Sequence, residues 1–327
     1  MLVLGDGQYR YEVSGENWGI LPPEWTYKEA TAVAVDAGDN VYVFNRGKHP
    51  MIVLDRNGKF VRSWGEGIFS NPHGVSIGPD DMVYCVDAGS HTVRKFTQDG
   101  RLLLTLGVTD RPSPRLSGIP FNHPTHMAVD QNDGCLYVSD GYSNASVHKF
   151  DPDGKLLFSW GRSGTGPGEF NTVHNIAVDK NRNVYVADRE NHRVQVFDSN
   201  GKYQAQWHNL AAAACVYVDT RSDPVVYVGE FYAGIPENAS GLGNWTGNRL
   251  GPRLSIFDTT GNLLSRVGDR PIGLETGQFV APHGICVDSR GDIYVAEVSF
   301  SAYGVRMTPP SEVKSLQKLV KTSKTRD

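Results

Sequence analysis

Short apolar segments alternate with polar turns along almost the whole chain. A strand-like segment ends in Asp or Gly, and a polar turn follows. A second apolar segment that contains Tyr then ends in an acidic residue or Asn. The six copies are AVAVDAGDNVYVFN, VSIGPDDMVYCVD, MAVDQNDGCLYVSD, IAVDKNRNVYVAD, VYVDTRSDPVVYVGE and ICVDSRGDIYVAE. Apolar runs this short, bounded by turn residues, predict β-hairpins.

The spacing of the copies predicts the fold. The first turn residues are Asp36, Gly78, Asp130, Asp179, Asp219 and Asp288. Repeats about 40–70 residues apart, each built of short strands, are typical of a β-propeller. Third segments such as SVHKFDPDG and fourth segments such as KLLFSWG follow the pairs. We therefore expect an all-β, six-bladed β-propeller over residues 1–308.

The two ends of the chain carry separate predictions. The sixth unit runs out after AYGVRM, whereas the N-terminal GQYRYEV has strand character, so we expect this N-terminal strand to complete the last blade and close the ring. Residues 309–327 contain SEVKSLQKLVK, which predicts a C-terminal tail with a short helix. Insertions at residues 108–120 and 231–252, rich in Gly, Pro and Asn, predict loops over one face.

Composition and charge narrow the function classes. The 327 residues are 39% hydrophobic and 21% charged, as in a globular protein, and the net charge of −4 disfavours a nucleic-acid partner. We expect no membrane partner, because no segment is long and apolar enough to span a bilayer and MLVLGDGQYRYEV lacks the features of a secretory signal. The cysteines Cys85, Cys135, Cys215 and Cys286 form no C-x-x-C pair, which predicts single buried thiols in a cytoplasmic protein.

The candidate chemistry lies five residues before each first turn position, where the innermost strand of a blade begins. This column reads Thr31, His73, Thr125, His174, Ala214 and His283. Alternate blades of a six-fold ring lie roughly 120° apart, so three imidazoles can meet at one point of the channel and leave a position open. Three protein ligands and an open position describe a catalytic zinc site. The alternative is three isolated polar residues lining the channel.

A second column directly follows the residue that ends the second strand of each unit. It reads Arg46, Ala88, Gly141, Arg189, Phe231 and Val298, and the next position in the third unit is Tyr142. We expect Arg46 and Tyr142 to face the metal from the rim, with ordinary turn residues as the alternative. Glu190 beside Arg189 favours a surface ion pair for that arginine.

The repeats resemble NHL repeats, and several segments resemble the catalytic core of peptidyl-α-hydroxyglycine α-amidating lyase. The matching segments, in order over five blades, are VYVFNRGKH, NPHGVSI, VYVSDGYSN, TVHNIAVD with VYVADRENHRVQ, and APHGICVD. The resemblance implies that His73, His174 and His283 bind zinc. It also implies that Arg46 holds a substrate carboxylate and that Tyr142 acts as a base. The implied substrate is a carboxylate-bearing α-hydroxyamide, cleaved to an amide and glyoxylate.

Two departures from the family limit the comparison. The family's structural calcium has a carboxylate ligand directly after the third histidine, and Gly284 at this position puts calcium in doubt. Ala281 replaces a methionine of the pocket wall. We therefore expect a lyase that uses zinc or another divalent transition metal and acts on a small molecule or peptide with a carboxylate. The alternatives are a metal-dependent hydrolase or lactonase, and a non-catalytic NHL interaction module.

Overall fold

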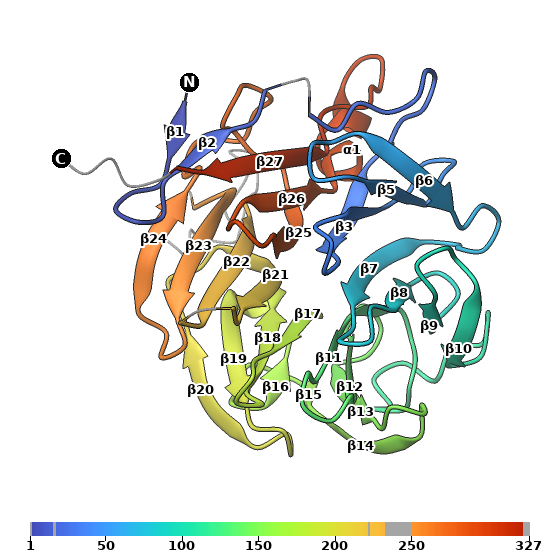
Figure 1. Ribbon diagram of the computed structural model, residues 1–327. Helices are drawn as coiled ribbons and strands as arrows, with labels where there is room; N and C mark the ends of the chain where they lie inside the picture. Colours follow the sequence, from blue (N-terminus) through green and yellow to red (C-terminus); the bar gives the residue numbers. More distant parts are fainter. Residues whose placement is uncertain (1, 16–17, 222, 233–249, 323–327) are drawn as a thin grey trace.

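Six β-sheets stand around a central axis in a computed structural model that describes residues 2–15, 18–221, 223–232 and 250–322 (Figure 1). Each sheet runs from an innermost to an outermost strand, and neighbouring strands are antiparallel. The expected all-β, six-bladed propeller is confirmed. A two-stranded ribbon of β15 (Arg162–Ser163) and β16 (Glu169–Phe170) lies outside the six sheets.

The blades follow one another along the chain. The first blade contains β3 (Ala30–Val35), β4 (Val41–Asn45), β5 (Met51–Leu54) and β6 (Phe60–Trp64), and the second contains β7 (Pro72–Ile77), β8 (Val83–Asp87), β9 (Thr92–Phe96) and β10 (Leu102–Leu106). The third contains β11 (Pro124–Val129), β12 (Leu136–Asp140), β13 (Ser146–Phe150) and β14 (Leu156–Trp160). The fourth contains β17 (Val173–Val178), β18 (Val184–Asp188), β19 (Arg193–Phe197) and β20 (Tyr203–Trp207), with the 3-10 turn η1 (Arg189–Asn191) after β18. The fifth contains β21 (Ala212–Asp219), β22 (Val225–Phe231), β23 (Arg253–Asp258) and β24 (Leu263–Val267).

The repeated Asp of the sequence pattern makes two kinds of contact, one with the backbone of the hairpin turn and one with the repeated Tyr. In the first blade the carboxylate of Asp36 accepts the backbone N–H of Asn40 at 2.8 Å, which closes the hairpin turn. The Tyr185 hydroxyl donates to Asp179 at 3.0 Å in the fourth blade, and the Tyr294 hydroxyl donates to Asp288 at 3.0 Å in the sixth. The tyrosine therefore satisfies a buried acid at the end of the first strand, which explains why both residues recur.

The sixth blade contains both ends of the chain. Its order is β1 (Val3–Leu4), β2 (Tyr11–Val13), β27 (Leu316–Lys321), β26 (Ile293–Glu297) and β25 (Pro282–Val287). Figure 1 shows β2 beside β27, and the register pairs Tyr11 with Lys321. The prediction that an N-terminal strand completes the last blade is confirmed.

The predictions for the C-terminal residues were wrong in two respects. The short helix expected in residues 309–327 is instead strand β27, so the propeller continues past residue 308. The segment up to AYGVRM, where the sixth unit runs out, ends not in a strand but in α1 (Ser299–Ala302) and η2 (Gly304–Arg306). Backbone pairing with both β26 and β2 overrides the weak helical periodicity of β27.

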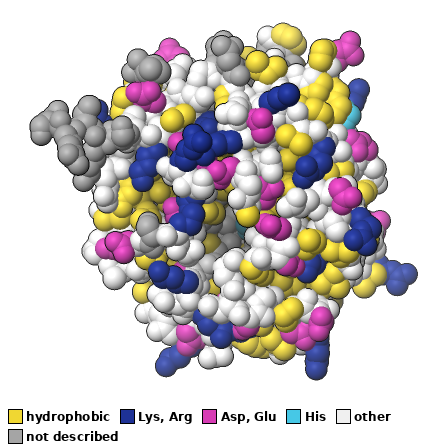
Figure 2. Space-filling view, viewed as in Figure 1, with side chains coloured by type: hydrophobic (Ala, Val, Ile, Leu, Met, Phe, Trp, Pro, Cys, Tyr) yellow, Lys and Arg dark blue, Asp and Glu magenta, His cyan; other side chains and the backbone are white. Residues whose placement is uncertain are grey.

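The remaining predictions concern loops, thiols and the surface. In the first insertion the backbone N–H of Leu116 donates to the Ser143 carbonyl at 3.0 Å, so this insertion lies against the third blade. Residues 233–249 of the second insertion lie outside the described residues. All four cysteines are buried and unpaired, as expected. None of the helices in the described part of the chain has the length and apolarity to cross a membrane. Figure 2 shows Lys and Arg interspersed with Asp and Glu on the viewed face.

Candidate metal centre

His73, His174 and His283 occupy the same position in three alternate blades. Each is the second residue of an innermost strand, where the pairing register shifts by one residue, for example between Pro72 and Gly74. Such a β-bulge re-aims the side chain of the extra residue. One ring nitrogen from each histidine lies within 4.8 Å of the others, and all three residues are buried. Among the described residues, this group of His, Cys, Asp and Glu side chains is the one placed to hold an ion.

The intervening blades fix the orientation of the three imidazoles. The Nδ1 atom lies 2.5 Å from the Thr125 carbonyl oxygen in His73, 2.5 Å from that of Ala214 in His174 and 2.6 Å from that of Thr31 in His283. These three acceptors are the non-histidine members of the same column. Because a carbonyl can only accept, each Nδ1 carries the hydrogen, and each Nε2 keeps its lone pair for a metal.

Burial keeps the three imidazoles neutral. It lowers the pKa of His73 and His174 well below the ordinary value, and neighbouring positive groups lower both further. The pKa of His283 falls to about 3, mainly through burial and then through the charge of Arg46. The neutral imidazole is the form that binds metal ions, so the cluster is ready to accept one at neutral pH.

Tyr142 lies directly at the three-histidine cluster. Its hydroxyl is 2.8 Å from Nε2 of His73 and 3.0 Å from Nε2 of His174. Gly141 makes this approach possible, because a Cβ atom at Gly141 would lie 2.0 Å from the Val173 carbonyl oxygen. The turn after β12 therefore packs against the residue preceding His174, which brings the phenol over the cluster.

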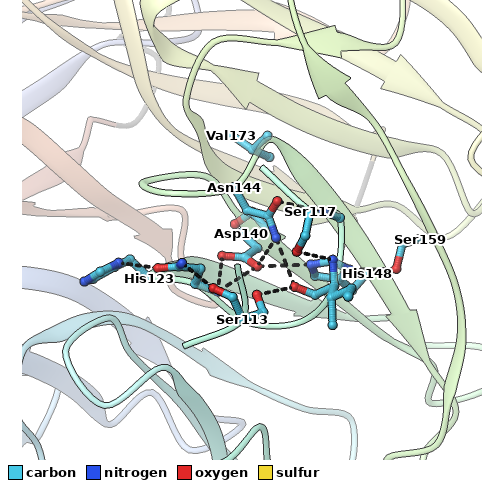
Figure 3. Close-up of polar contacts among 12 residues, drawn as sticks. Ser113, Ser117, His123, Asp140, Asn144, His148, Ser159 and Val173 are labelled. Carbon is cyan, nitrogen blue, oxygen red and sulfur yellow. Dashed lines mark hydrogen bonds and ion pairs between the residues drawn. The ribbon is translucent and has the colours of Figure 1, made fainter. Parts of the chain in front are cut away.

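A buried polar network holds this turn in place (Figure 3). Asp140 accepts a hydrogen bond from the Asn144 amide at 3.0 Å and lies 3.2 Å from Nε2 of His148. His148 in turn contacts the Ser159 hydroxyl at 2.7 Å. The equivalent acid of the fourth blade, Asp188, also binds a third-strand side chain. The contacts of Ser159, His148 and Asp140 therefore repeat, with other residue types, a structural contact between the second and third strands of a blade.

Arg46 reaches the rim of the cluster from the first blade. Its Nη1 atom forms a 2.7 Å ion pair with Glu29, which is only 1% exposed. Its Nε atom donates to the carbonyl of Pro72, the residue before His73, at 3.3 Å. Ser301 donates to the same glutamate from its backbone N–H and its hydroxyl, both at 2.7 Å. The two hydrogen bonds from Ser301 fix Glu29, and Glu29 and the Pro72 carbonyl together hold the Arg46 guanidinium beside the three-histidine cluster.

Arg189 is a site residue that the sequence analysis missed. The expected ion pair with Glu190 is present, at 2.7 Å. The guanidinium carbon also lies 5.6 Å from the ring centroid of Tyr142 and 5.7 Å from that of Phe231. Arg189 occupies the same column as Arg46, and this shared position could have indicated that Arg189 also lies at the rim. The adjacent Glu190 favoured the surface interpretation instead.

The residues next to the histidine column lack the carboxylate expected for the family's calcium site. The ring of residues directly after the histidine column consists of Ala32, Gly74, His126, Asn175, Cys215 and Gly284, none of which is a carboxylate. A Cβ atom at Gly284 would lie 2.7 Å from the Cα of Ala32, so a longer side chain has no room there. Calcium prefers several oxygen ligands, and this ring offers one side-chain amide.

Comparison with known proteins supports the propeller and the lyase resemblance. Residues 126–230 match a family model described as a 6-bladed beta-propeller, and residues 279–299 match the NHL repeat. NHL repeat-containing protein 3 of Homo sapiens is 32% identical over 200 residues, covering 57% of this chain and 57% of that protein. Peptidyl-alpha-hydroxyglycine alpha-amidating lyase 1 of Drosophila melanogaster is 32% identical over 260 residues, covering 74% of this chain and 45% of that protein.

Both matches span less than two thirds of the relatives' own length. Among solved structures, a gluconolactonase from Xanthomonas campestris superposes with a TM-score of 0.59 at 13% identity, covering 90% of this chain and 86% of that one. This level of identity shows a shared fold.

Proposed function

We propose that this six-bladed NHL-repeat propeller, homologous to peptidyl-α-hydroxyglycine α-amidating lyase, is a metal-dependent lyase. Its reaction would cleave the C–N bond of a carboxylate-bearing α-hydroxyamide and yield an amide and glyoxylate. The observation that carries the proposal is the position of the Tyr142 hydroxyl, within 3.0 Å of Nε2 in both His73 and His174. A candidate base that is 38% exposed and buried candidate metal ligands thus meet at one point.

The residues of the three-histidine cluster fit a transition metal. Three neutral imidazoles with fixed tautomers offer three nitrogen ligands and leave a position open, which suits zinc or a related divalent ion. When bound, such an ion supplies Lewis acidity toward the substrate hydroxyl. His73, His174 and His283 would hold it through Nε2.

Tyr142 is the proposed proton carrier. As a phenolate it accepts the proton of the substrate hydroxyl; the hydroxyl oxygen then forms the aldehyde C=O bond as the C–N bond breaks. The electron pair of that bond passes to the amide nitrogen, which takes the proton back from Tyr142. Tyr142 therefore ends each turnover as the phenolate, and no net proton or electron is gained or lost. The Arg189 guanidinium carbon lies 5.6 Å from the Tyr142 ring centroid and brings a positive charge next to the proposed base.

Arg46 is the proposed anchor for the substrate carboxylate. Its contacts with Glu29 and Pro72 use Nη1 and Nε, and the planar guanidinium carries five N–H donors in all. The remaining donors can bind a carboxylate in a defined orientation. Because Arg46 is held beside His73 by its contact with the Pro72 carbonyl, a carboxylate bound there would hold the substrate next to the three-histidine cluster.

The test is a steady-state assay of the zinc-loaded protein on α-hydroxyhippurate, with glyoxylate as the measured product. Release of one glyoxylate per benzamide supports the lyase. The fold shared with a gluconolactonase favours a metal-dependent hydrolase or lactonase as the second candidate. A zinc-loaded protein that opens sugar lactones and releases no glyoxylate would favour this second candidate. An NHL interaction module needs no buried three-histidine cluster, so the geometry favours it least.

A further inference from the structure

The rim above the three-histidine cluster is divided into a cationic and an apolar part. Arg46 and Arg189 occupy the rim column in blades one and four, whereas Phe231 and Val298 occupy it in blades five and six. Tyr142 lies at the rim in blade three. Charged or titratable rim residues thus lie in blades one, three and four, whereas the same column carries Phe231 and Val298 in blades five and six.

Phe231 lies close to the candidate metal ligands. Its ring centroid is 6.0 Å from that of His283, with the two planes 34° apart, and 6.3 Å from that of His174. The guanidinium carbon of Arg189 lies 5.7 Å from the Phe231 ring centroid, so Arg189 borders the apolar part of the rim. The phenyl ring is only partly buried, so part of its surface is open to a ligand.

An apolar cluster supports the phenyl ring from behind. Its buried members are Val280, Ala281 and Val298, and its partly buried members are Phe231, Ala302 and Tyr303. The Oε2 atom of Glu297 accepts hydrogen bonds from the backbone N–H groups of Val280, at 2.6 Å, and Ala281, at 3.0 Å, which fixes the backbone of this cluster. A fixed apolar wall beside the reacting centre is the usual design of a pocket for a hydrocarbon group.

We propose that this cluster is the acyl-binding subsite and selects α-hydroxyglycines with an apolar, preferably aromatic, N-acyl group. The inference rests on the proposed lyase function. The substrate's hydroxyl is directed to the metal position and Tyr142, and its carboxylate to Arg46. The substrate's acyl group is then left without an assigned partner. Among the described residues, the rim column of blades five and six carries the apolar side chains of Phe231 and Val298.

The expected preference follows from the contact of a ligand ring with Phe231. Aromatic pairs of this kind contribute enough to change an equilibrium constant by about tenfold. We therefore expect kcat/KM for the benzoyl compound to exceed that for the acetyl compound by up to about tenfold. Phe231→Ala should remove this difference, and Phe231→Leu should retain part of it.

The experiment compares binding and turnover in the zinc-loaded protein. Calorimetry measures the Kd of benzoylglycine and acetylglycine, which lack the hydroxyl and are not cleaved, and kinetics measures the two α-hydroxy compounds. The control variant is Leu102→Ala, which truncates an exposed leucine on the outermost strand of the second blade. The proposal predicts tighter binding of benzoylglycine in the wild type and the control, and similar binding of both ligands in Phe231→Ala.

The outcomes separate the two proposals. Equal Kd values for the two ligands in the wild type, or a preference that survives in Phe231→Ala, would overturn the subsite. A Phe231-dependent preference in binding without cleavage of either α-hydroxy compound would support the subsite and overturn the lyase. Melting curves of each variant show whether the fold is retained.

Discussion

Replacing Gly141 with Ala should disable Tyr142 without touching any candidate metal ligand. The added Cβ atom would lie 2.0 Å from the Val173 carbonyl oxygen, 2.5 Å from its nitrogen and 2.6 Å from its carbonyl carbon. All three are backbone atoms of an inner strand, and the same carbonyl accepts the Thr125 hydroxyl at 2.7 Å. The turn that carries Tyr142 is therefore the part that must move.

The size of the effect follows from this clash. Relief of the 2.0 Å clash to an ordinary contact of about 3.4 Å requires a shift of roughly 1.4 Å. A misplacement of about 1 Å can already cost a reaction about 100-fold. We expect kcat for α-hydroxyhippurate to fall by about this factor and the free energy of unfolding to fall by about 1–3 kcal/mol. Zinc content should stay normal, because His174 keeps its contact with the Ala214 carbonyl.

The assay measures kcat, zinc content and the melting temperature of each variant. Gly15→Ala is the matched control, since a Cβ atom at Gly15 meets no atom within 4 Å. A Gly141→Ala protein with wild-type kcat and normal zinc would refute the positioning role of the turn.

Three further predictions concern the same site. Tyr142→Phe should lower kcat by about 10²–10⁴-fold at unchanged zinc content, because the proton carrier is lost; steady-state kinetics showing an unchanged kcat would remove Tyr142 as base. Arg46→Ala should mainly raise KM, by roughly 10–100-fold, through loss of charge-assisted hydrogen bonds to the carboxylate; a variant with a normal KM would place the anchor elsewhere. The metal-free protein should lose stability as the pH falls below 6.5, because burial depresses the folded pKa of His283 to about 3 and the unfolded chain takes up the proton first. This group alone should cost about 2 kcal/mol between pH 6.5 and pH 5, measurable by urea unfolding, and a free energy of unfolding that is constant over this range would contradict it.

Much of the fold could be predicted from the sequence because the repeat encodes local contacts. Asp–Tyr pairs stabilise the first hairpin of blades one, four and six, and the His column coincides with the β-bulges at the start of the inner strands. Strand β27 could not be predicted in the same way, because its conformation depends on pairing with β2, about 300 residues away in the chain.

The site was predictable only where its residues repeat in register. His73, His174 and His283 stand in one column, so their meeting follows from the symmetry of the ring. The carbonyl acceptors that fix their tautomers are backbone atoms and leave no trace in the residue types. The contact of Arg189 with Tyr142 crosses from blade four to blade three, and a local ion pair concealed it.

The most direct test of the account is the metal content of the purified protein and of its histidine variants. Elemental analysis should find one zinc-like ion in the wild type and in His208→Ala, which changes an exposed histidine outside the cluster. His73→Ala, His174→Ala and His283→Ala should each lose most of the ion, because each removes one of three ligands. Full occupancy in all three single variants would place the ion elsewhere and contradict the central claim.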